Sequence, residues 1–238
     1  MQLDLLAFGA HPDDVELACS GTIAKQVSLN HTAGIIDLTK GELSTRGTVE
    51  EREKEAKEAA SILKLSVREN LQFSDGFFQN DKEHQLEVIK MIRKYRPEVV
   101  LCNAFSDRHP DHGKASELVR DACFYSGLNK IETKDNGEFQ KAWRPKAVYH
   151  YIQYYHIEPD FLVDISDFME IKMASIKAYQ SQFYNPDSKE PDTVISRKEF
   201  LDKIKSRDLI NGSAIGTLYA EGFCKERPIG IKDLMSLL

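Results

Sequence analysis

The sequence predicts a doubly wound α/β domain whose sheet is mostly parallel and carries helices on both faces. The first observation is a regular alternation, through residues 1–127, of short apolar segments with longer amphipathic ones. That alternation is typical of parallel strands joined by crossover helices. The second is size, because 238 residues with a hydrophobic content of 41% can bury one large core. No repeat, low-complexity tract or clear linker divides the chain, so we expect a single domain over residues 1–238.

The alternating segments fall into four strand–helix pairs. Strands are expected at residues 3–8, 33–39, 69–73 and 98–105, and helices at 15–29, 49–65, 83–95 and 112–127. The first strand, LDLLAF, is almost wholly apolar, and Asp13 or Asp14 is placed to cap the helix that follows. The second helix is highly charged but keeps three alanines and Leu63 on one face, and Pro97 stops the third. This order of elements is Rossmann-like.

The chain after residue 128 is less regular, but we expect it to belong to the same domain. Its expected strands lie at 147–155 and 161–165, and its expected helices at 167–183 and 196–210. Two segments, KDNGEF (134–139) and YNPDSKEPD (184–192), combine the turn-forming residues Gly, Pro, Asn and Asp. We expect both to be loops.

Charge and cysteine content narrow the class of protein and its compartment. The net charge is −6, so no basic field covers the chain and nucleic acid is not an expected partner. The opening residues, MQLDLLAFGA, are too acidic for a signal peptide, and no run approaches the ~18–20 apolar residues of a membrane span. The four cysteines are widely separated and form no CxxC pair, which favours reduced core residues over a four-cysteine zinc site. We expect a cytoplasmic protein that does not bind membranes.

Polar side chains gather after two of the predicted strands. His11, Asp13 and Asp14 follow the first strand within the stretch GAHPDD. The segment HPDH, residues 109–112, follows the strand over 98–105. Ligands of open parallel sheets bind beyond the carboxyl ends of the strands, so the fold is expected to bring both clusters to one edge.

Two imidazoles and a carboxylate suit a catalytic divalent metal. His11, Asp14 and His112 offer three protein ligands and leave a coordination position open for water. The mixed nitrogen and oxygen set fits Zn²⁺, and Fe²⁺ or another divalent ion is an alternative. Asp13 can then take a proton from the water, whose pKa a metal lowers to about 7.

Each cluster alone also has a purely structural reading. An Asp-Asp pair before a helix is most often a cap, and His-Pro-Asp-His can be an exposed turn. Because both clusters follow strand ends of one sheet, a joint structural explanation is much less favoured. Asp107 and Arg108 read as loop surface, and His150 as core or pocket wall. His109 could polarise a carbonyl oxygen or protonate a leaving amine, with Asp111 orienting its ring.

The two motifs resemble those of a known enzyme family. AHPDDVE, residues 10–16, is similar to the AHPDDxE signature of the LmbE-like, or PIG-L, zinc-dependent N-deacetylases, and HPDH matches the second motif of that family. The resemblance includes TKGELSTRGT (39–48) and spans most of the chain. The STRGT loop, SQF (181–183) and AEGF (220–223) resemble the branch that acts in bacillithiol biosynthesis.

The resemblance implies a role for each motif residue. Asp13 would be the general base. His109 would stabilise the oxyanion or act as general acid, and Asp111 would tune it. The residues that would hold the metal are His11, Asp14 and His112.

The resemblance also implies a substrate and an assembly. The family removes acetyl groups from N-acetylglucosamine conjugates, and the bacillithiol branch converts N-acetylglucosaminyl-malate into glucosaminyl-malate and acetate. Members of that branch tend to be homo-oligomers, often hexamers. Arg46 and Arg52 are candidates to bind substrate hydroxyls or carboxylates, although arginine is mostly an exposed residue in any protein.

Several other functions compete with this one. A mycothiol-type conjugate amidase or a chitooligosaccharide deacetylase would use the same site. A nucleotide-binding protein is disfavoured, because GAHPDD lacks G-x-G-x-x-G and places two negative charges where a pyrophosphate would lie. A metal-binding regulator with a decayed site is disfavoured because Asp13 and His109 are both present.

Overall fold

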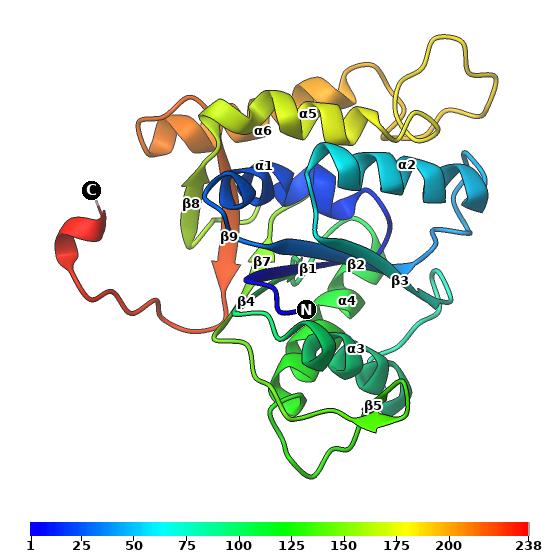
Figure 1. Cartoon of the computed structure of the whole chain (residues 1–238). Coiled ribbons are helices and arrows are strands. Elements are labelled where there is room, and N and C mark those ends of the chain that lie inside the picture. The colour runs from blue at the N-terminus through cyan, green and yellow to red at the C-terminus, as the bar shows by residue number, and fades with distance from the viewer. Residues whose placement is uncertain (238) are drawn as a thin grey trace.

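A computed structural model of the chain describes residues 1–237 and confirms the predicted fold class (Figure 1). The central sheet has seven strands in the order β3-β2-β1-β4-β7-β9-β8. The first five in this order run parallel, whereas β9 is antiparallel to both of its neighbours. The chain leaves β1 toward β2 on one side and later returns to β4 on the other. A ligand crevice is expected at such a switch point, beyond the carboxyl ends of the strands.

The parallel part of the sheet contains the four predicted strand–helix pairs and one further strand. The strands are β1 (Leu5–Gly9), β2 (Ala33–Thr39), β3 (Val67–Phe73), β4 (Val99–Asn103) and β7 (Ala147–Tyr151). The helices are α1 (Asp14–Ser28), α2 (Val49–Ile62), α3 (Lys82–Tyr95) and α4 (Pro110–Tyr125). Among residues 1–237, no helix has both the length and the apolar character needed to cross a membrane.

Alternate side chains of β1 contribute to two separate cores. Leu6 and Phe8 belong to a cluster with apolar residues of α3 and α4, whereas Leu5 and Ala7 belong to a cluster with α1. This division follows from the period of two along a strand. In Figure 1, α1 and α2 accordingly cover one face of the sheet, and α3 and α4 cover the other.

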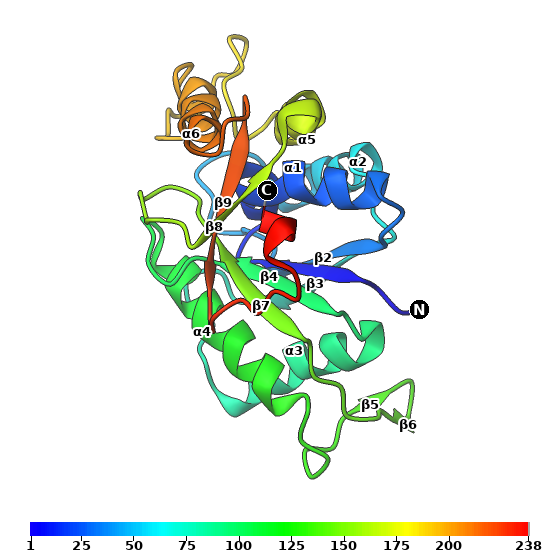
Figure 2. The same cartoon turned by 90° about the vertical axis from the view of Figure 1, so that its left-hand side faces the viewer.

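Two C-terminal helices form an outer layer over α1 and α2. They are α5 (Met169–Lys177), which follows the short 3-10 helix η1 (Ser166–Phe168), and α6 (Phe200–Ala214). A third apolar cluster joins them to Leu17 of α1 and to Ala56 and Ala59 of α2. Figure 2 shows this layer stacked above α1 and α2, on the side away from the sheet.

Several predicted elements of the C-terminal part are too long, because tertiary hydrogen bonds end them. β7 stops at Tyr151 instead of 155, since Gln153 and the backbone of Tyr155 turn toward the sheet edge and bond to carboxylates there. The predicted helix over 167–183 ends at Lys177. Beyond it, the backbone and side chain of Ser181 both donate to Glu55 of α2, at 2.7 and 2.8 Å.

Other elements carry weak sequence signals. The pattern does not predict β9 (Ala220–Lys225), because its centre holds Glu221 and Gly222 in place of alternating apolar residues. The expected loop at 134–139 contains a small hairpin. It pairs β5 (Lys134–Asp135) with β6 (Glu138–Phe139) through Asn136 and Gly137, both at positive φ. The remaining elements are β8 (Phe161–Asp164) and the 3-10 helix η2 (Leu234–Leu237). α6 lies further along the chain than the predicted 196–210, and residues 184–192 contain no helix or strand.

A buried charge cluster ties the outer layer to the rest of the domain. Lys172 Nζ of α5 lies 2.7 Å from oxygens of both Asp208 in α6 and Glu221 in β9, and all three side chains are fully buried. Glu221 also accepts hydrogen bonds from the backbone of Gly21 and Thr22, just after α1 departs from helical geometry at Cys19. Removal of the lysine would leave the buried carboxylates of Asp208 and Glu221 without the positive charge that they share.

We expect the substitution Lys172→Met to lower the free energy of unfolding by about 3–5 kcal/mol, the usual cost of breaking a buried ion pair. Urea denaturation followed by circular dichroism measures the change. Lys177→Met is a matched control, because Lys177 is exposed on the same helix and surface changes usually stay within about 0.5 kcal/mol. Equal losses in the two variants would contradict a stabilising role of the cluster.

Candidate active site

Loops after the parallel strands meet around one cavity of about 310 Å³ at the carboxyl edge of the sheet. The volume lies at the low end of the range for ligand pockets. The loops after β1, β3, β4 and β7 each contribute to its lining. Six of the eight site residues predicted from the sequence line it: His11, Asp13, Asp14, Arg52, His109 and His112. The other two, Asp111 and Arg46, are buried and do not line the cavity.

The two neighbouring carboxylates of the first motif point in different directions, because Asp13 has an unusual backbone. Its φ of 114° lies in the left-handed region, which a non-glycine residue adopts only at a cost of about 1–3 kcal/mol. Arg52 Nη2 donates to the carbonyl of Pro12 at 2.5 Å and to the Asp13 carboxylate at 2.8 Å. Asp13 occupies the N-cap position of α1, but its side chain caps nothing. The expectation that one of the two aspartates caps this helix is therefore wrong for Asp13.

Asp13 combines burial with a single strong cationic partner. Its carboxylate is 5% exposed and lines the cavity. Burial raises the pKa of Asp13 to about 7, even though the Arg52 guanidinium acts in the opposite direction. A carboxylate with a pKa near neutrality can both accept and return a proton.

Asp14 lies between the two histidines that the sequence pairs with it. Its oxygens are 3.6 Å from His11 Nδ1 and 3.1 Å from His112 Nε2. It also accepts hydrogen bonds from the side chains of Gln153, at 2.8 Å, and Asn103, at 3.2 Å. Burial opposes ionisation, but the neighbouring His112 and His11 outweigh it and hold the pKa of Asp14 well below its usual range. Asp14 is therefore an ionised acceptor fixed from several sides.

His112 is oriented by Asp107, which the sequence analysis assigns to the loop surface. The structure overturns that assignment: the Asp107 side chain is 1% exposed and its Oδ2 lies 2.8 Å from His112 Nδ1. The other Asp107 oxygen accepts from the backbone of Arg108 and Tyr155. Because Nδ1 is engaged by a carboxylate, the Nε2 atom of His112 is left to face Asp14 and the cavity.

His11 contacts carboxylates through both ring nitrogens. Its Nε2 lies 2.9 Å from Asp75 and 3.5 Å from Asp111, and its Nδ1 faces Asp14. The Asp111 carboxylate also accepts from the backbone of Gly76 and from Lys114. The contacts of this carboxylate thus lead to His11, whereas the sequence analysis pairs it with the ring of His109.

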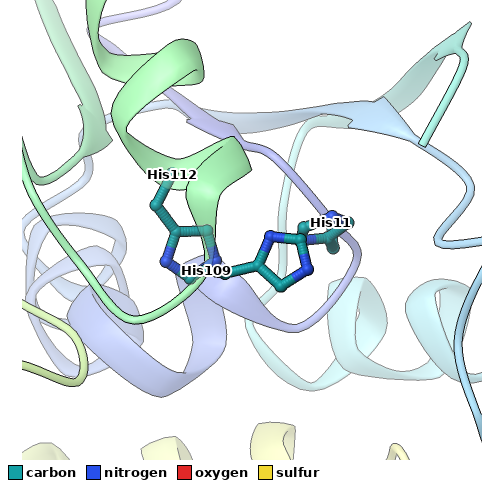
Figure 3. A group of neighbouring side chains, drawn as sticks. All are labelled: His11, His109 and His112. Atoms are coloured by element: carbon teal, nitrogen blue, oxygen red, sulfur yellow. The ribbon is translucent and has the colours of Figure 1, made fainter. Parts of the chain in front are cut away.

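His109 is the N-cap residue of α4, and its ring forms a triangle with the rings of His11 and His112 (Figure 3). The ring centroids are 4.6 Å from His11 and 5.5 Å from His112. Its Nδ1 accepts a hydrogen bond from the backbone N–H of Asp111, at 3.3 Å. Burial lowers the pKa of His109, and the neighbouring imidazoles lower it further. A neutral ring whose Nδ1 is an acceptor carries its proton on Nε2, so His109 is prepared to donate one hydrogen bond.

The donor set fits a divalent metal. Ring nitrogens of His11, His109 and His112 lie within 4.8 Å of one another, and donor atoms of His11, Asp75 and Asp111 form a second group of that size. Burial lowers the pKa of His112, but the Asp14 and Asp107 carboxylates outweigh it and raise that pKa to about 9. The positive charges of protonated imidazoles thus offset part of the negative charge of the surrounding carboxylates. A divalent cation among neutral nitrogens and ionised oxygens would supply the same positive charge.

A second group of charged side chains, from Glu16, Arg68 and Asp37, fixes the first turn of α1. Glu16, the last residue of the AHPDDVE stretch, is fully buried and accepts from Arg68 at 2.5 Å and from the Tyr179 hydroxyl at 3.1 Å. Arg68 also donates to both oxygens of Asp37, at 2.8 and 2.9 Å. These contacts join α1, β2 and β3, so they fix the helix that carries Asp14.

The two arginines proposed for substrate binding have different surroundings. Arg52 lines the cavity, but its Nη2 is engaged with Pro12 and Asp13. Arg46 is 3% exposed and does not line the cavity. Its Nε donates to the carbonyl of Ser181 and lies 3.8 Å from Glu190.

Sequence reasoning misses four residues that hold the site together. They are Asn103, Asp75, Asp107 and Gln153. Asp75 and Gln153 directly follow β3 and β7, so the rule that ligands lie beyond strand ends could have found them. Asp75 is hidden because Ser-Asp-Gly is also an ordinary turn sequence.

Comparisons with known proteins agree with this geometry. The family model described as PIG-L, GlcNAc-PI de-N-acetylase, matches residues 6–123. Diacetylchitobiose deacetylase of Thermococcus kodakarensis is 31% identical over 228 residues, which cover 92% of this chain and 81% of that protein. Mycothiol S-conjugate amidase of Streptomyces coelicolor is 28% identical over 63% of this chain and 60% of its own length.

A solved structure extends the likeness to the whole fold. The conserved protein TT1542 from Thermus thermophilus superposes with a TM-score of 0.87 and 36% identity, covering 98% of this chain and 99% of that one. Together with the match to the Thermococcus kodakarensis deacetylase and the arrangement of both sequence motifs around one cavity, this shows that the chain belongs to the PIG-L family of de-N-acetylases.

Proposed function

We propose that the protein is a metal-dependent amidohydrolase that removes the acetyl group of an N-acetylglucosaminide. The observation that carries the proposal is the divergence of Asp13 and Asp14. One carboxylate is poised near neutrality beside Arg52, and the other is held ionised between two histidines. Metal-dependent amide hydrolysis needs both kinds of group, a base to move a proton and a ligand to hold the metal.

His11, Asp14 and His112 would hold the ion, with Zn²⁺ as the preferred metal for this mixed nitrogen and oxygen set. When bound, a divalent ion supplies Lewis acidity and lowers the pKa of a coordinated water. The pairing of His112 Nδ1 with Asp107 supports this choice, because it leaves Nε2 free on the side of Asp14.

Asp13 would act as general base and accept the proton of the attacking water. His109 would donate a hydrogen bond from its Nε2–H to the carbonyl oxygen as negative charge develops there. Such a donor contributes about 3–4 kcal/mol in comparable acyl-transfer sites. Because burial places the pKa of Asp13 at about 7, the proton that it has gained is then available to the departing amine. Asp111 would act through His11, which its carboxylate faces.

The substrate that we propose is N-acetylglucosaminyl-malate, as in the bacillithiol branch that the sequence resembles. A chitooligosaccharide or a mycothiol-type conjugate is the alternative, and the named relatives include an enzyme of each kind. Homo-oligomer formation, often as a hexamer in that branch, and a cytoplasmic location stay predictions from the sequence.

An amine-release assay of the zinc-loaded protein across a panel of N-acetylglucosaminides tests the proposal. Malyl, methyl, chitobiosyl and inositol conjugates represent the competing substrate classes. We expect release of a free amine and of acetate in equal amounts from at least the malyl conjugate. An absence of amine release from every conjugate would refute the deacetylase proposal.

The substitution Asp13→Asn is expected to keep the metal and lose about 10²–10⁴-fold in kcat, the usual loss on removal of a general base. Metal content measured on the same preparation separates the two effects. If the variant loses its metal, or turns over at nearly the wild-type rate, the assignment of Asp13 as base and Asp14 as metal ligand is wrong.

The substitution Asp107→Ala is expected to weaken zinc binding about 10- to 100-fold, because it removes the carboxylate that orients His112. Competition with a chromophoric chelator measures the affinity, and Asp107→Asn, which keeps an acceptor without the charge, should lose less. Asp121→Asn on the outer part of α4 is the control. If Asp107→Ala bound zinc as tightly as the control does, Asp107 would not contribute to zinc binding through the orientation of His112.

A further inference from the structure

One cation in the active-site cavity is used neither by the reaction proposed above nor by an ion pair. Arg108 lines the cavity next to His109 and is exposed. Within the described residues its guanidinium has no carboxylate partner, and only its backbone N–H bonds to Asp107. Arg108 is predicted from the sequence to be loop surface, whereas in the structure it lines the cavity.

The guanidinium of Arg108 is held by an aromatic column that starts in the core. Its Cζ lies 5.1 Å from the centre of the Tyr154 ring. Tyr154 stacks on Phe200 at 6.5 Å and 19°, and Phe200 stacks on Phe183 at 6.0 Å and 8°. Both phenylalanines are buried members of the apolar cluster beneath α5 and α6, whereas Tyr154 is 36% exposed. The column therefore runs from a rigid core to the mouth of the cavity.

This arrangement leaves the hydrogen-bonding edge of the arginine available. A cation–π contact uses none of the five N–H donors of a guanidinium, and within the described residues no side-chain hydrogen bond or ion pair of Arg108 occupies them. A guanidinium restrained in this way loses less entropy when it binds a ligand than a freely rotating side chain does. Its planar fork matches a carboxylate, which it can bind through two parallel hydrogen bonds.

The other arginines near the site are already engaged. Arg52 holds Pro12 and Asp13, and Arg46 is buried against Ser181 and Glu190 outside the cavity lining. The remaining lining includes three carboxylates, from Asp13, Asp14 and Asp75. A negatively charged substrate group would be repelled by them unless a cation stood nearby.

The chemistry of an N-acetylglucosaminide places its aglycone close to the reacting amide. The acetamide is on the second ring carbon and the aglycone on the first, so the two substituents are on adjacent atoms. Arg108 directly precedes His109, the residue that would donate to the amide oxygen. The Cα atoms of consecutive residues are only about 3.8 Å apart. Arg108 and His109 can therefore contact substituents on adjacent carbons of one sugar ring.

We propose that Arg108, restrained by Tyr154, binds a carboxylate of the aglycone and makes the enzyme selective for N-acetylglucosaminides with an acidic aglycone. The inference rests on the proposed deacetylase function and names its substrate class. Arg108 takes the role that the sequence analysis gives to Arg46 and Arg52.

The test compares kcat and KM of the zinc-loaded enzyme for the malyl and methyl N-acetylglucosaminides. We expect the wild-type enzyme to prefer the malyl conjugate. In Arg108→Gln the preference should fall about 10- to 100-fold, mainly through KM for the malyl conjugate, as expected for the loss of a charge-assisted pair. Arg108→Lys keeps the charge but not the planar fork and should fall between the two.

Two further comparisons separate this role from a general structural effect. Tyr154→Leu should lower the preference and Tyr154→Phe should retain it, because phenylalanine keeps the stacking surface. Arg144→Gln is the matched control, since Arg144 is also stacked on an aromatic ring, that of Phe124, but lies outside this cavity. Its preference should equal that of the wild-type enzyme.

The outcomes are distinct. Equal kcat/KM values for the two conjugates in the wild-type enzyme would overturn the acidic-aglycone inference while leaving a general deacetylase. A fall of equal size for both conjugates in Arg108→Gln would assign Arg108 to the sugar or the reaction instead. A change of preference in Arg46→Gln but not in Arg108→Gln would return the role to Arg46. No amine release from either conjugate would refute the deacetylase function itself.

Discussion

The contact between Arg52 and the Pro12–Asp13 segment is the constraint on which the rest of the site depends. Two adjacent aspartates in ordinary helical or extended conformations would repel each other and compete for one cation. Arg52 stabilises a left-handed Asp13 by binding its carboxylate and the preceding carbonyl, and so turns it away from Asp14. Arg52 in turn is fixed by α2, whose amino end carries a complete capping box of Thr48 and Glu51. The position of the proposed base thus depends on the packing of a whole helix.

The same region shows how the fold tolerates so many carboxylates in a buried place. Asp14, Asp75, Asp107 and Asp111 surround two imidazoles, and each oxygen pair is also bonded to backbone or amide donors. Burial of ionised carboxylates is costly unless they are paired and hydrogen-bonded. Their positive partners in the described structure are His11 and His112, together with Lys114, whose Nζ lies 3.0 Å from the Asp111 carboxylate. A divalent metal at this position would take the place of the protons on these imidazoles.

The sequence predicts the parallel half of the fold and the gathering of the two motifs at one edge of the sheet, because each depends on local patterns. Apolar runs followed by amphipathic segments define the strands and helices, and the strand-end rule places His11 and His109 on one edge. The pattern fails where long-range contacts decide the structure. Ser181 ends a helix by bonding to Glu55, and Glu221 sits in a strand only because Lys172 neutralises it. Asp107 and Asp75 also resemble ordinary turn residues until their histidine partners are placed beside them.

The residues proposed for the reaction and several of those that complete the cavity lie in different parts of the chain. The residues proposed to bind the metal and move protons all lie within 6–123, the part that the family model matches. The rest of the lining comes partly from this same matched region and partly from Gln153, Gln182 and residues 193–195, in the irregular C-terminal part. The aromatic column crosses this division, since Tyr154 and Phe200 support Arg108 from outside the matched region. Changes at Tyr154 or Phe200 can therefore alter the support of Arg108, which is not one of the proposed metal ligands. Relatives that share both motifs can thus differ in the group attached to the sugar.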